Sequence, residues 1–221
     1  MYRYRHPHPA ITTDIVIFTI RQQHLELLLI QRKGEPYRDC WALPGGFVEI
    51  DEGLEACALR ELEEETGATG VYLEQLYTFG TPGRDPRERV ISIAYYALVP
   101  TGCLQIRAAS DASEVGWFNR DDLPPLAFDH DVIVSMAHDR LASKLDYSTI
   151  ALQFMPGKFT LSELQKVYEI IRGEPVDKRN FRKRVLAYNC IKDTGELKRN
   201  GNHRPARLYS HTSPNTVEFI K

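Results

Sequence analysis

The chain begins with apolar stretches of strand length. Residues 11–19 and 25–31 are rich in aliphatic and β-branched side chains, and the polar residues 21–24 separate them, so this pattern predicts a β-hairpin. Three later stretches predict further strands for the same reason: 71–79, 90–99 and 113–119.

Helical spacing of apolar residues occurs between these strands and after them. Residues 54–66 place their apolar side chains on one helical face, and Gly67 follows in the position of a C-cap. A turn-rich segment, residues 41–53, leads into this helix, and residues 129–145 predict a second one. We therefore expect a mixed α/β domain over residues 1–150.

The pattern changes in the last third of the chain. Thr160 and Glu163 have the spacing of a capping box, and the apolar residues that follow predict a helix that ends at Gly173. Residues 177–189 predict another helix, and two short extended pieces around a polar loop come after it. Two helices followed by a β-hairpin are typical of a winged helix-turn-helix domain, which we expect over residues 151–221.

The charge distribution supports this division. Residues 158–221 carry 14 Lys and Arg against 7 Asp and Glu, a surplus of +7, so the rest of a chain with net charge −2 carries −9. The longest apolar runs have strand length and the N-terminus lacks the apolar core of a secretory signal, so we expect no membrane span and a cytoplasmic location. The four cysteines have neither metal-site nor disulfide-framework spacing and are expected to be reduced.

Residues 60–67, RELEEETG, contain four glutamates. On a helix, Glu61, Glu64 and Glu65 share a face because they are three or four residues apart. Carboxylates repel one another unless a cation compensates, and Mg²⁺ takes carboxylate oxygens and bridges them to phosphates. Taken alone, the stretch is more simply interpreted as a solvated acidic helix.

The residues around this helix change that interpretation. Gly46 is followed after five residues by Glu52, and after seven more by the motif at residues 60–68. The whole segment 46–68 resembles the Nudix box, Gly-x5-Glu-x7-Arg-Glu-aliphatic-x-Glu-Glu-x-Gly-aliphatic, and matches every fixed position. The resemblance implies a Nudix α/β/α sandwich that cleaves a nucleoside diphosphate linked to another group.

The resemblance also implies roles for the residues of the box. The ligands of Mg²⁺ or Mn²⁺ would be Glu61, Glu64 and Glu65, with the backbone carbonyl of Gly45 or Gly46 nearby. Arg60 would orient the glutamates, and Glu52 would support them or contact the metal through water. In such a site the cation neutralises the diphosphate and activates a water for attack at phosphorus, and Arg60 and Glu64 belong to the catalytic set.

The general base is expected on the loop that follows the box. Glu88 lies where some Nudix enzymes place a catalytic acid, and Asp85 is the other candidate. Arg84 and Arg89, with Arg87 between them, are candidates for binding a substrate phosphate or a terminal ribose. All of these charges have an alternative interpretation as solvated loop residues.

The helix predicted at residues 177–189 is strongly basic, and its Lys and Arg form rows at i, i+4 spacing away from the apolar face. A basic second helix of a helix-turn-helix is expected to enter the major groove of DNA. The DNA contacts would come from this helix and the following hairpin: Lys178, Arg179, Arg182, Lys183, Arg204 and Arg207. The alternative is a solvated charged helix in an accessory domain.

Over essentially its whole length, the chain resembles the Nudix-related transcriptional regulators of NAD metabolism, whose relatives regulate sugar utilisation. The resemblance implies a homodimer whose paired winged helices read a palindromic operator, and an ADP-ribose-type ligand in the Nudix domain. Many members of that group have a degraded box and no longer hydrolyse the ligand. The box of this chain is intact, so hydrolysis is expected as well.

Two other hypotheses stay open at this point. The chain could be a metabolic Mg²⁺-dependent ADP-ribose or nucleotide-sugar pyrophosphatase whose C-terminal segment serves dimerisation or stability. It could also act on RNA, although the C-terminal segment lacks the interleaved aromatic residues of a base-stacking surface. The sequence does not distinguish ADP-ribose from NADH or other nucleotide sugars.

Overall fold

The computed structural model describes residues 5–67, 69–100, 112–199, 205–213 and 216–220. Ala68 at the end of the Nudix box, Cys103 and the predicted DNA contact Arg204 lie outside these ranges. Within them, no helix combines the length and the apolar character that crossing a membrane requires.

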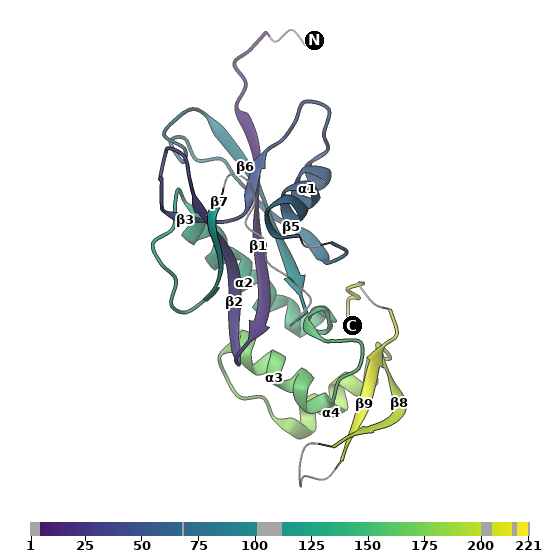
Figure 1. Cartoon of the computed structure of the whole chain (residues 1–221). Coiled ribbons are helices and arrows are strands. Elements are labelled where there is room, and N and C mark those ends of the chain that lie inside the picture. Colours follow the sequence, from purple (N-terminus) through teal and green to yellow (C-terminus); the bar gives the residue numbers. More distant parts are fainter. Residues whose placement is uncertain (1–4, 68, 101–111, 200–204, 214–215, 221) are drawn as a thin grey trace.

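The first part of the chain forms one mixed β-sheet (Figure 1). β1 (Ala10–Arg21) and β2 (His24–Arg32) form the expected hairpin, and β1 also pairs in parallel with β6 (Val90–Val99). The strand order is β3-β2-β1-β6-β5, with β4 paired to β1 and β7 paired to β2. The remaining bounds are Trp41–Ala42 for β3, Gly45–Phe47 for β4, Tyr72–Phe79 for β5 and Ala112–Asn119 for β7.

Two helices, α1 (Leu54–Thr66) and α2 (His130–Tyr147), cover opposite faces of this sheet. Successive residues of a strand point to opposite faces, so Ile15 packs in the apolar cluster on the α1 side and Val16 in the cluster on the α2 side. Because both faces are covered, the central strands are apolar on both sides. The three layers are the α/β/α sandwich that the resemblance implied.

The segment expected to be turn-rich, residues 41–53, also contains the short strands β3 and β4. In the pairing of β4 with β1, Gly46 lies opposite Thr13. Gly45 has a φ of +152°, and a Cβ at this position would lie 2.0 Å from the backbone oxygen of Thr13. Only glycine fits here. The pairing therefore fixes the start of the Nudix box against the middle of the sheet.

The last third of the chain forms two helices and a β-hairpin. The bounds are Leu161–Arg172 for α3, Lys178–Ala187 for α4, Ile191–Lys198 for β8 and Ala206–His211 for β9. An antiparallel bridge from Phe159 to Tyr209 joins the segment before α3 to the hairpin. This order of elements is that of a winged helix, as the sequence predicted.

Two helices end at other residues than the pattern predicted, and residues 150–154 form a short 3-10 helix, η1 (Ile150–Phe154). α2 continues to Tyr147 instead of ending at residue 145. α4 ends at Ala187 rather than at Asn189, because Tyr188 closes the helix and Asn189 has a left-handed φ of 53°.

One apolar core runs from the sheet into the winged helix. The cluster on the α2 side includes Leu141 of α2 and continues through Leu164 of α3 to Phe181 of α4. His138 Nε2 of α2 also lies 3.1 Å from the backbone oxygen of Ile171 in α3. The two parts of the chain are thus packed against each other, and the expected domain boundary after residue 150 stays a prediction.

The start of α3 allows a prediction about stability. Glu163 N–H donates to Thr160 Oγ1 at 3.2 Å and Thr160 N–H donates to the Glu163 carboxylate at 2.7 Å, which confirms the capping box. Thr160→Ala is expected to lower the free energy of unfolding by about 1 kcal/mol, because a helix N–H loses its acceptor. Urea unfolding measures this change. Ser135→Ala, at an exposed position of α2, is the control, and equal losses in both variants would contradict the prediction.

Candidate functional site

The Nudix box folds into the β4 turn followed by α1, and Gly67 ends α1 in the left-handed conformation. Glu61 and Glu65 face this turn. Gly45 N–H donates to Glu65 Oε2 at 2.9 Å, and a Cβ on Gly46 would lie 2.1 Å from Glu61 Oε1. Glu65 is only 2% exposed. The box therefore holds two buried carboxylates against a turn whose glycines leave room for them.

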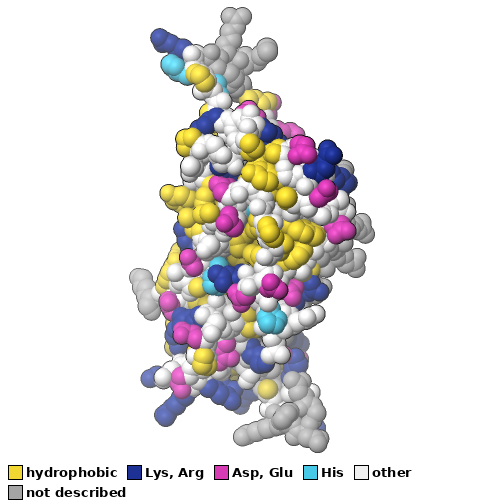
Figure 2. All heavy atoms as spheres, turned by 90° about the vertical axis from the view of Figure 1, so that its left-hand side faces the viewer, with side chains coloured by type: hydrophobic (Ala, Val, Ile, Leu, Met, Phe, Trp, Pro, Cys, Tyr) yellow, Lys and Arg dark blue, Asp and Glu magenta, His cyan; other side chains and the backbone are white. Residues whose placement is uncertain are grey.

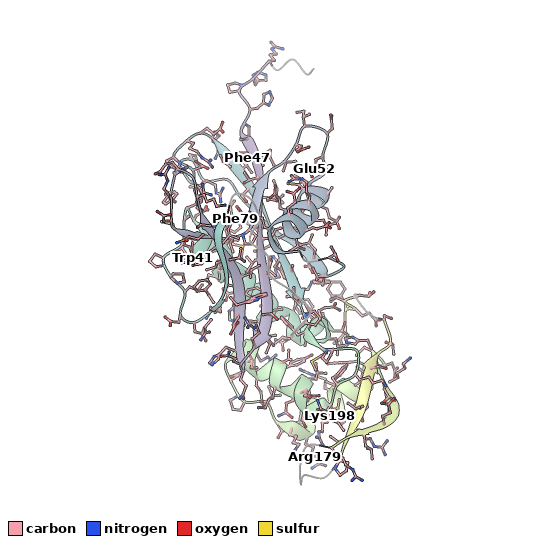
Figure 3. All side chains as sticks on the ribbon, in the orientation of Figure 1. Trp41, Phe47, Glu52, Phe79, Arg179 and Lys198 are labelled. Atoms are coloured by element: carbon pink, nitrogen blue, oxygen red, sulfur yellow. The ribbon has the colours of Figure 1, made fainter. Side chains whose placement is uncertain are left out.

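Arg60 connects the glutamates of the box. Its Nε and Nη2 donate to the two carboxylate oxygens of Glu52 at 2.8 and 2.9 Å, in the loop before α1 (Figure 3). Its Nη1 donates to Glu61 Oε1 at 2.7 Å and to Glu64 Oε2 at 3.3 Å. The fork of the guanidinium thus fixes the orientation of several carboxylates at once, and the expected role of Arg60 in catalysis stays a prediction.

The three expected metal ligands differ in their surroundings. Glu61 and Glu65 lie at the turn, whereas the side chain of Glu64 is 58% exposed and pairs with Arg60. Among the residues that the structure describes, no three His, Cys, Asp or Glu side chains are grouped so as to hold a metal ion. Two buried carboxylates beside a backbone turn do fit a divalent cation, which prefers hard oxygen donors. The ligand roles of the glutamates and of Gly45 stay predictions.

A cavity of about 270 Å³ opens beside the turn, and several of its lining residues belong to a polar network. Asp14 of β1 accepts hydrogen bonds from Ser92 Oγ at 2.5 Å and from Arg84 Nη2 at 3.5 Å. Leu43 N–H donates to Nδ1 of His130 at 2.9 Å. Burial lowers the pKa of His130, so the imidazole is neutral and Nδ1 accepts. Sequence reasoning missed this network, although an aspartate within the apolar run of β1 was a sign of it.

Some side chains of the loop between β5 and β6 line this cavity, and others are exposed to solvent. Arg84, Asp85 and Arg87 line the cavity, whereas Glu88 and Arg89 are exposed and do not line it. Asp85 accepts a hydrogen bond from Arg87 Nη2 at 2.7 Å, and this bond lowers the pKa of Asp85. Arg84 is itself paired with carboxylates of the chain. The roles expected for Glu88 as general base and for Arg84 and Arg89 as substrate ligands stay predictions.

Aromatic rings and guanidinium groups form the rim of the cavity. The guanidinium carbon of Arg87 lies 5.6 Å from the ring centre of Phe47 and 5.8 Å from that of Phe128. Arg32 lies 4.9 Å from the ring centre of Phe128, and Tyr37 meets the same ring edge-on. Flat rings and guanidinium planes are surfaces on which a nucleobase stacks. The sequence did not indicate this rim because its residues come from the ends of β2 and β4 and from three separate loops.

The Arg60–Glu52 pair allows a prediction about pH. The hydrogen bonds from Arg60 lower the pKa of Glu52 from its ordinary 4.5 to about 2. A carboxyl whose pKa is lower in the folded state stabilises the fold fully above pH 4.5 and loses this effect as the pH falls toward 2. Glu52→Gln should therefore flatten the fall in the free energy of unfolding across this window, as measured by urea unfolding. Asp51→Asn, an exposed neighbour, should leave the profile unchanged, and identical profiles for both variants would contradict the assignment.

The basic side chains of α4 lie at the end of the molecule opposite the Nudix box. Figure 3 places Arg179 and Lys198 at one end and Phe47 and Glu52 at the other. Figure 2 shows Lys and Arg side chains gathered at the lower end, where the winged helix lies. Phe181 is buried in the core, whereas Arg179 and Lys183 are exposed, as the helical pattern predicted.

A groove lies between the start of α3, α4 and the hairpin, and Lys178, Arg182 and Arg207 are among the residues that line it. Arg207 also pairs with Asp193 at 2.6 Å across the hairpin. The structure thus brings three of the expected DNA contacts to one groove, and their contact with DNA stays a prediction. Arg204 belongs to the part of the chain that is not described.

Comparisons with known families match two separate segments of the chain. The family described as the NUDIX domain matches residues 9–136. The family described as the NrtR DNA-binding winged helix domain matches residues 151–211.

Individual relatives extend this result. The ADPR responsive transcriptional repressor NtrR of Acinetobacter baylyi is 40% identical over 207 residues, which cover 92% of this chain and 82% of that protein. The ADP-ribose pyrophosphatase of Methanocaldococcus jannaschii is 42% identical over 127 residues, 58% of this chain and 72% of the enzyme. The crystal structure of Shewanella oneidensis NrtR complexed with a 27mer DNA is similar with a TM-score of 0.83 and 39% identity, over 91% of this chain and 93% of that chain. The chain therefore belongs to the Nudix family and, within it, to the NrtR group, in which a winged helix domain follows the Nudix domain.

Proposed function

We propose that this chain is a transcriptional repressor that responds to ADP-ribose and also hydrolyses it. The observation that carries the proposal is the presence of two sites in one packed chain: a cavity beside an intact Nudix box and a basic helix at the opposite end. The 40% identity to an ADPR responsive repressor over 92% of the chain supports it.

The cavity and its rim suit a nucleoside diphosphate sugar. The adenine of ADP-ribose would stack on the rim formed by Phe47, Arg87 and Phe128, and the diphosphate would lie beside the Gly45–Gly46 turn. Arg84 and Arg89 are the proposed phosphate or ribose ligands from the neighbouring loop. Cationic groups at such a site offset the charge of the diphosphate and orient it by directed hydrogen bonds.

The Nudix box would hold the divalent cation that the family uses, Mg²⁺ or Mn²⁺. Its donors would be Glu61, Glu64 and Glu65, the carbonyl of Gly45 and, through water, Glu52. When bound, such a cation neutralises the diphosphate and lowers the pKa of a bound water. Arg60 keeps the carboxylate of Glu61 in place, and Glu88 is the proposed base for the attacking water.

Hydrolysis would consume the effector. Water adds across the diphosphate of ADP-ribose, the bond between phosphorus and the bridging oxygen breaks, and AMP and ribose 5-phosphate leave. The intact box and the 42% identity to an ADP-ribose pyrophosphatase support turnover. A regulator that destroys its own effector would return to the repressing form without a second signal.

The C-terminal domain, residues 151–221, would read DNA, and residues 1–150 would form the effector domain. α4 would lie in the major groove, with Lys178, Arg179, Arg182 and Lys183 near phosphates or guanine edges and Arg204 and Arg207 reaching from the wing. A homodimer in the cytoplasm would place two such helices on a palindromic operator.

DNA from upstream of the chain's own gene tests the proposal. The full-length protein is expected to bind a palindrome there at about 50 mM salt, to lose affinity steeply as salt rises, and to be released by ADP-ribose. Absence of binding at low salt would rule out a regulator that acts on its own gene. Binding to unrelated DNA of equal length measures how much of the affinity does not depend on the DNA sequence.

Because the box is intact, an alternative function is that of a metabolic pyrophosphatase whose C-terminal domain serves dimerisation. A panel of ADP-ribose, NADH and nucleotide sugars, assayed for AMP release with Mg²⁺ and with operator DNA present or absent, separates the two. Turnover that is indifferent to DNA, in a protein that binds no operator, would favour the metabolic enzyme.

A further inference from the structure

Asp129 occupies the N-cap position of α2 but does not cap the helix. A capping aspartate normally accepts hydrogen bonds from N–H groups of its own helix. Here both carboxylate oxygens of Asp129 accept hydrogen bonds from Arg84 instead. Arg84 Nη2 donates to Oδ1 at 2.6 Å, and Nε donates to Oδ2 at 3.0 Å. The backbone of Asp129, at φ −108° and ψ 28°, also lies outside the extended conformation of a capping residue. An ion pair has replaced the helix cap.

The residue before Asp129 is held in an unfavourable conformation. Phe128 has a φ of +55°, in the left-handed region that bulky side chains avoid. Its ring lines the cavity and lies near the guanidinium groups of Arg32 and Arg87. Such a backbone persists only where its surroundings impose it. The contacts of the Phe128 ring at the cavity therefore keep the backbone just before α2 in this conformation.

Arg84 joins this entry to the cavity. Its side chain is 5% exposed, it lines the cavity, and its Nη2 also lies 3.5 Å from Asp14 Oδ2. A diphosphate accepts hydrogen bonds from a guanidinium in the same forked geometry as a carboxylate, so the two compete for it. An anion beside Arg84 would therefore draw the guanidinium away from Asp129.

The other end of α2 is packed on the winged helix. His138 Nε2 of α2 lies 3.1 Å from the backbone oxygen of Ile171 in α3. Asp146 of α2 forms an ion pair with Arg172 of α3. Leu141 belongs to the core cluster that continues into α3 and α4. A change in the direction of α2 at its first turn is therefore transmitted to the helices that carry the basic surface.

We propose that the Arg84–Asp129 ion pair is the switch through which a diphosphate in the cavity weakens DNA binding, an inference that rests on the proposed function. Without effector, the pair holds Phe128 and Asp129 as observed. With effector, Arg84 turns to the diphosphate, Asp129 caps α2, and Phe128 leaves the left-handed conformation. α2 then shifts against α3. Arg84 is in this respect a positioning residue, because it acts on DNA binding through Asp129.

Substitution of Asp129 by serine separates capping from pairing. Serine caps a helix well but cannot form the ion pair, so Asp129→Ser should resemble the effector-bound form. We expect its affinity for operator DNA without effector to fall about fivefold or more, and added effector to change it less than about twofold. Asp131→Ser, an exposed residue of the first turn of α2, makes the same charge change and should keep the affinity and the response of the wild type.

Fluorescence anisotropy of labelled operator DNA is the measurement, with the α,β-methylene analogue of ADP-ribose as effector because hydrolysis does not remove it. Hydrogen exchange supplies a second reading in the wild type, where the amides of residues 131–133 should exchange more slowly once the analogue is bound. An Asp129→Ser protein that binds DNA as tightly as the wild type and is still released would overturn the switch alone. A wild type that binds both ligands without coupling would overturn the proposed function together with the switch.

Discussion

Glu65→Gln is expected to lower kcat for AMP release from ADP-ribose by roughly 10³-fold, because a metal site contributes several kcal/mol of transition-state stabilisation. Glu65 is buried against the turn and accepts the Gly45 N–H, and a glutamine oxygen can still accept this bond. The fold and the cavity should therefore be kept, while the negative charge that attracts a divalent cation is lost. Chromatographic measurement of AMP at saturating ADP-ribose and Mg²⁺ gives kcat directly.

Glu63→Gln is the matched control for this variant. It makes the same chemical change two residues away on α1, at an exposed position outside the expected ligand set. Its kcat should stay within about twofold of the wild type, since exposed helix charges contribute little. ADP-ribose should still release DNA from both variants. Equal activity of the Glu65 and Glu63 variants would contradict a metal role for Glu65.

Arg179→Ala is expected to lower the affinity for operator DNA about tenfold and to reduce the slope of log K against log salt by about 0.9, the loss of one phosphate contact. Arg179 is exposed on α4, at the end of the molecule opposite the Nudix box (Figure 3). Hydrolysis of ADP-ribose should be unchanged, because the cavity lies far from this helix. Titrations of operator DNA at four salt concentrations measure both quantities.

Arg38→Ala controls for the loss of one positive charge. Arg38 lies on the loop between β2 and β3, and its side chain is 59% exposed. Removing it should leave both the affinity for DNA and the salt slope near those of the wild type. A surface charge far from the DNA interacts with it only weakly, because salt screens the interaction. If Arg38→Ala reduced the salt slope as much as Arg179→Ala does, α4 would not be the element that contacts phosphate.

The elements that the sequence predicted well are those whose signal is local. Apolar residues on both faces of β1 and β6, the capping box at Thr160 and the glycines that end α1 and α3 all lie within one element or at its end. β3 and β4 were not predicted, because they depend on partners elsewhere in the chain. The pairing of Gly46 with Thr13 joins residues more than 30 positions apart.

The same distinction applies to the site. The Nudix box is a single local segment, so its spacing was enough to indicate that Arg60 and Glu52, eight positions apart, lie together. The lining of the cavity is assembled from separate elements, with Asp14 on β1 and His130 at the start of α2. The left-handed φ of Phe128 has no signal in its sequence, because the contacts that impose it are tertiary.

The central claim is that one chain both reads DNA and is released from it by a nucleotide that it destroys. The most direct test follows the anisotropy of labelled operator DNA over time, after one addition of ADP-ribose to the full-length protein with Mg²⁺. The anisotropy should fall at once and then recover at the rate at which AMP accumulates, whereas with Glu65→Gln it should fall and stay low. An anisotropy that does not change on addition of ADP-ribose would contradict the account.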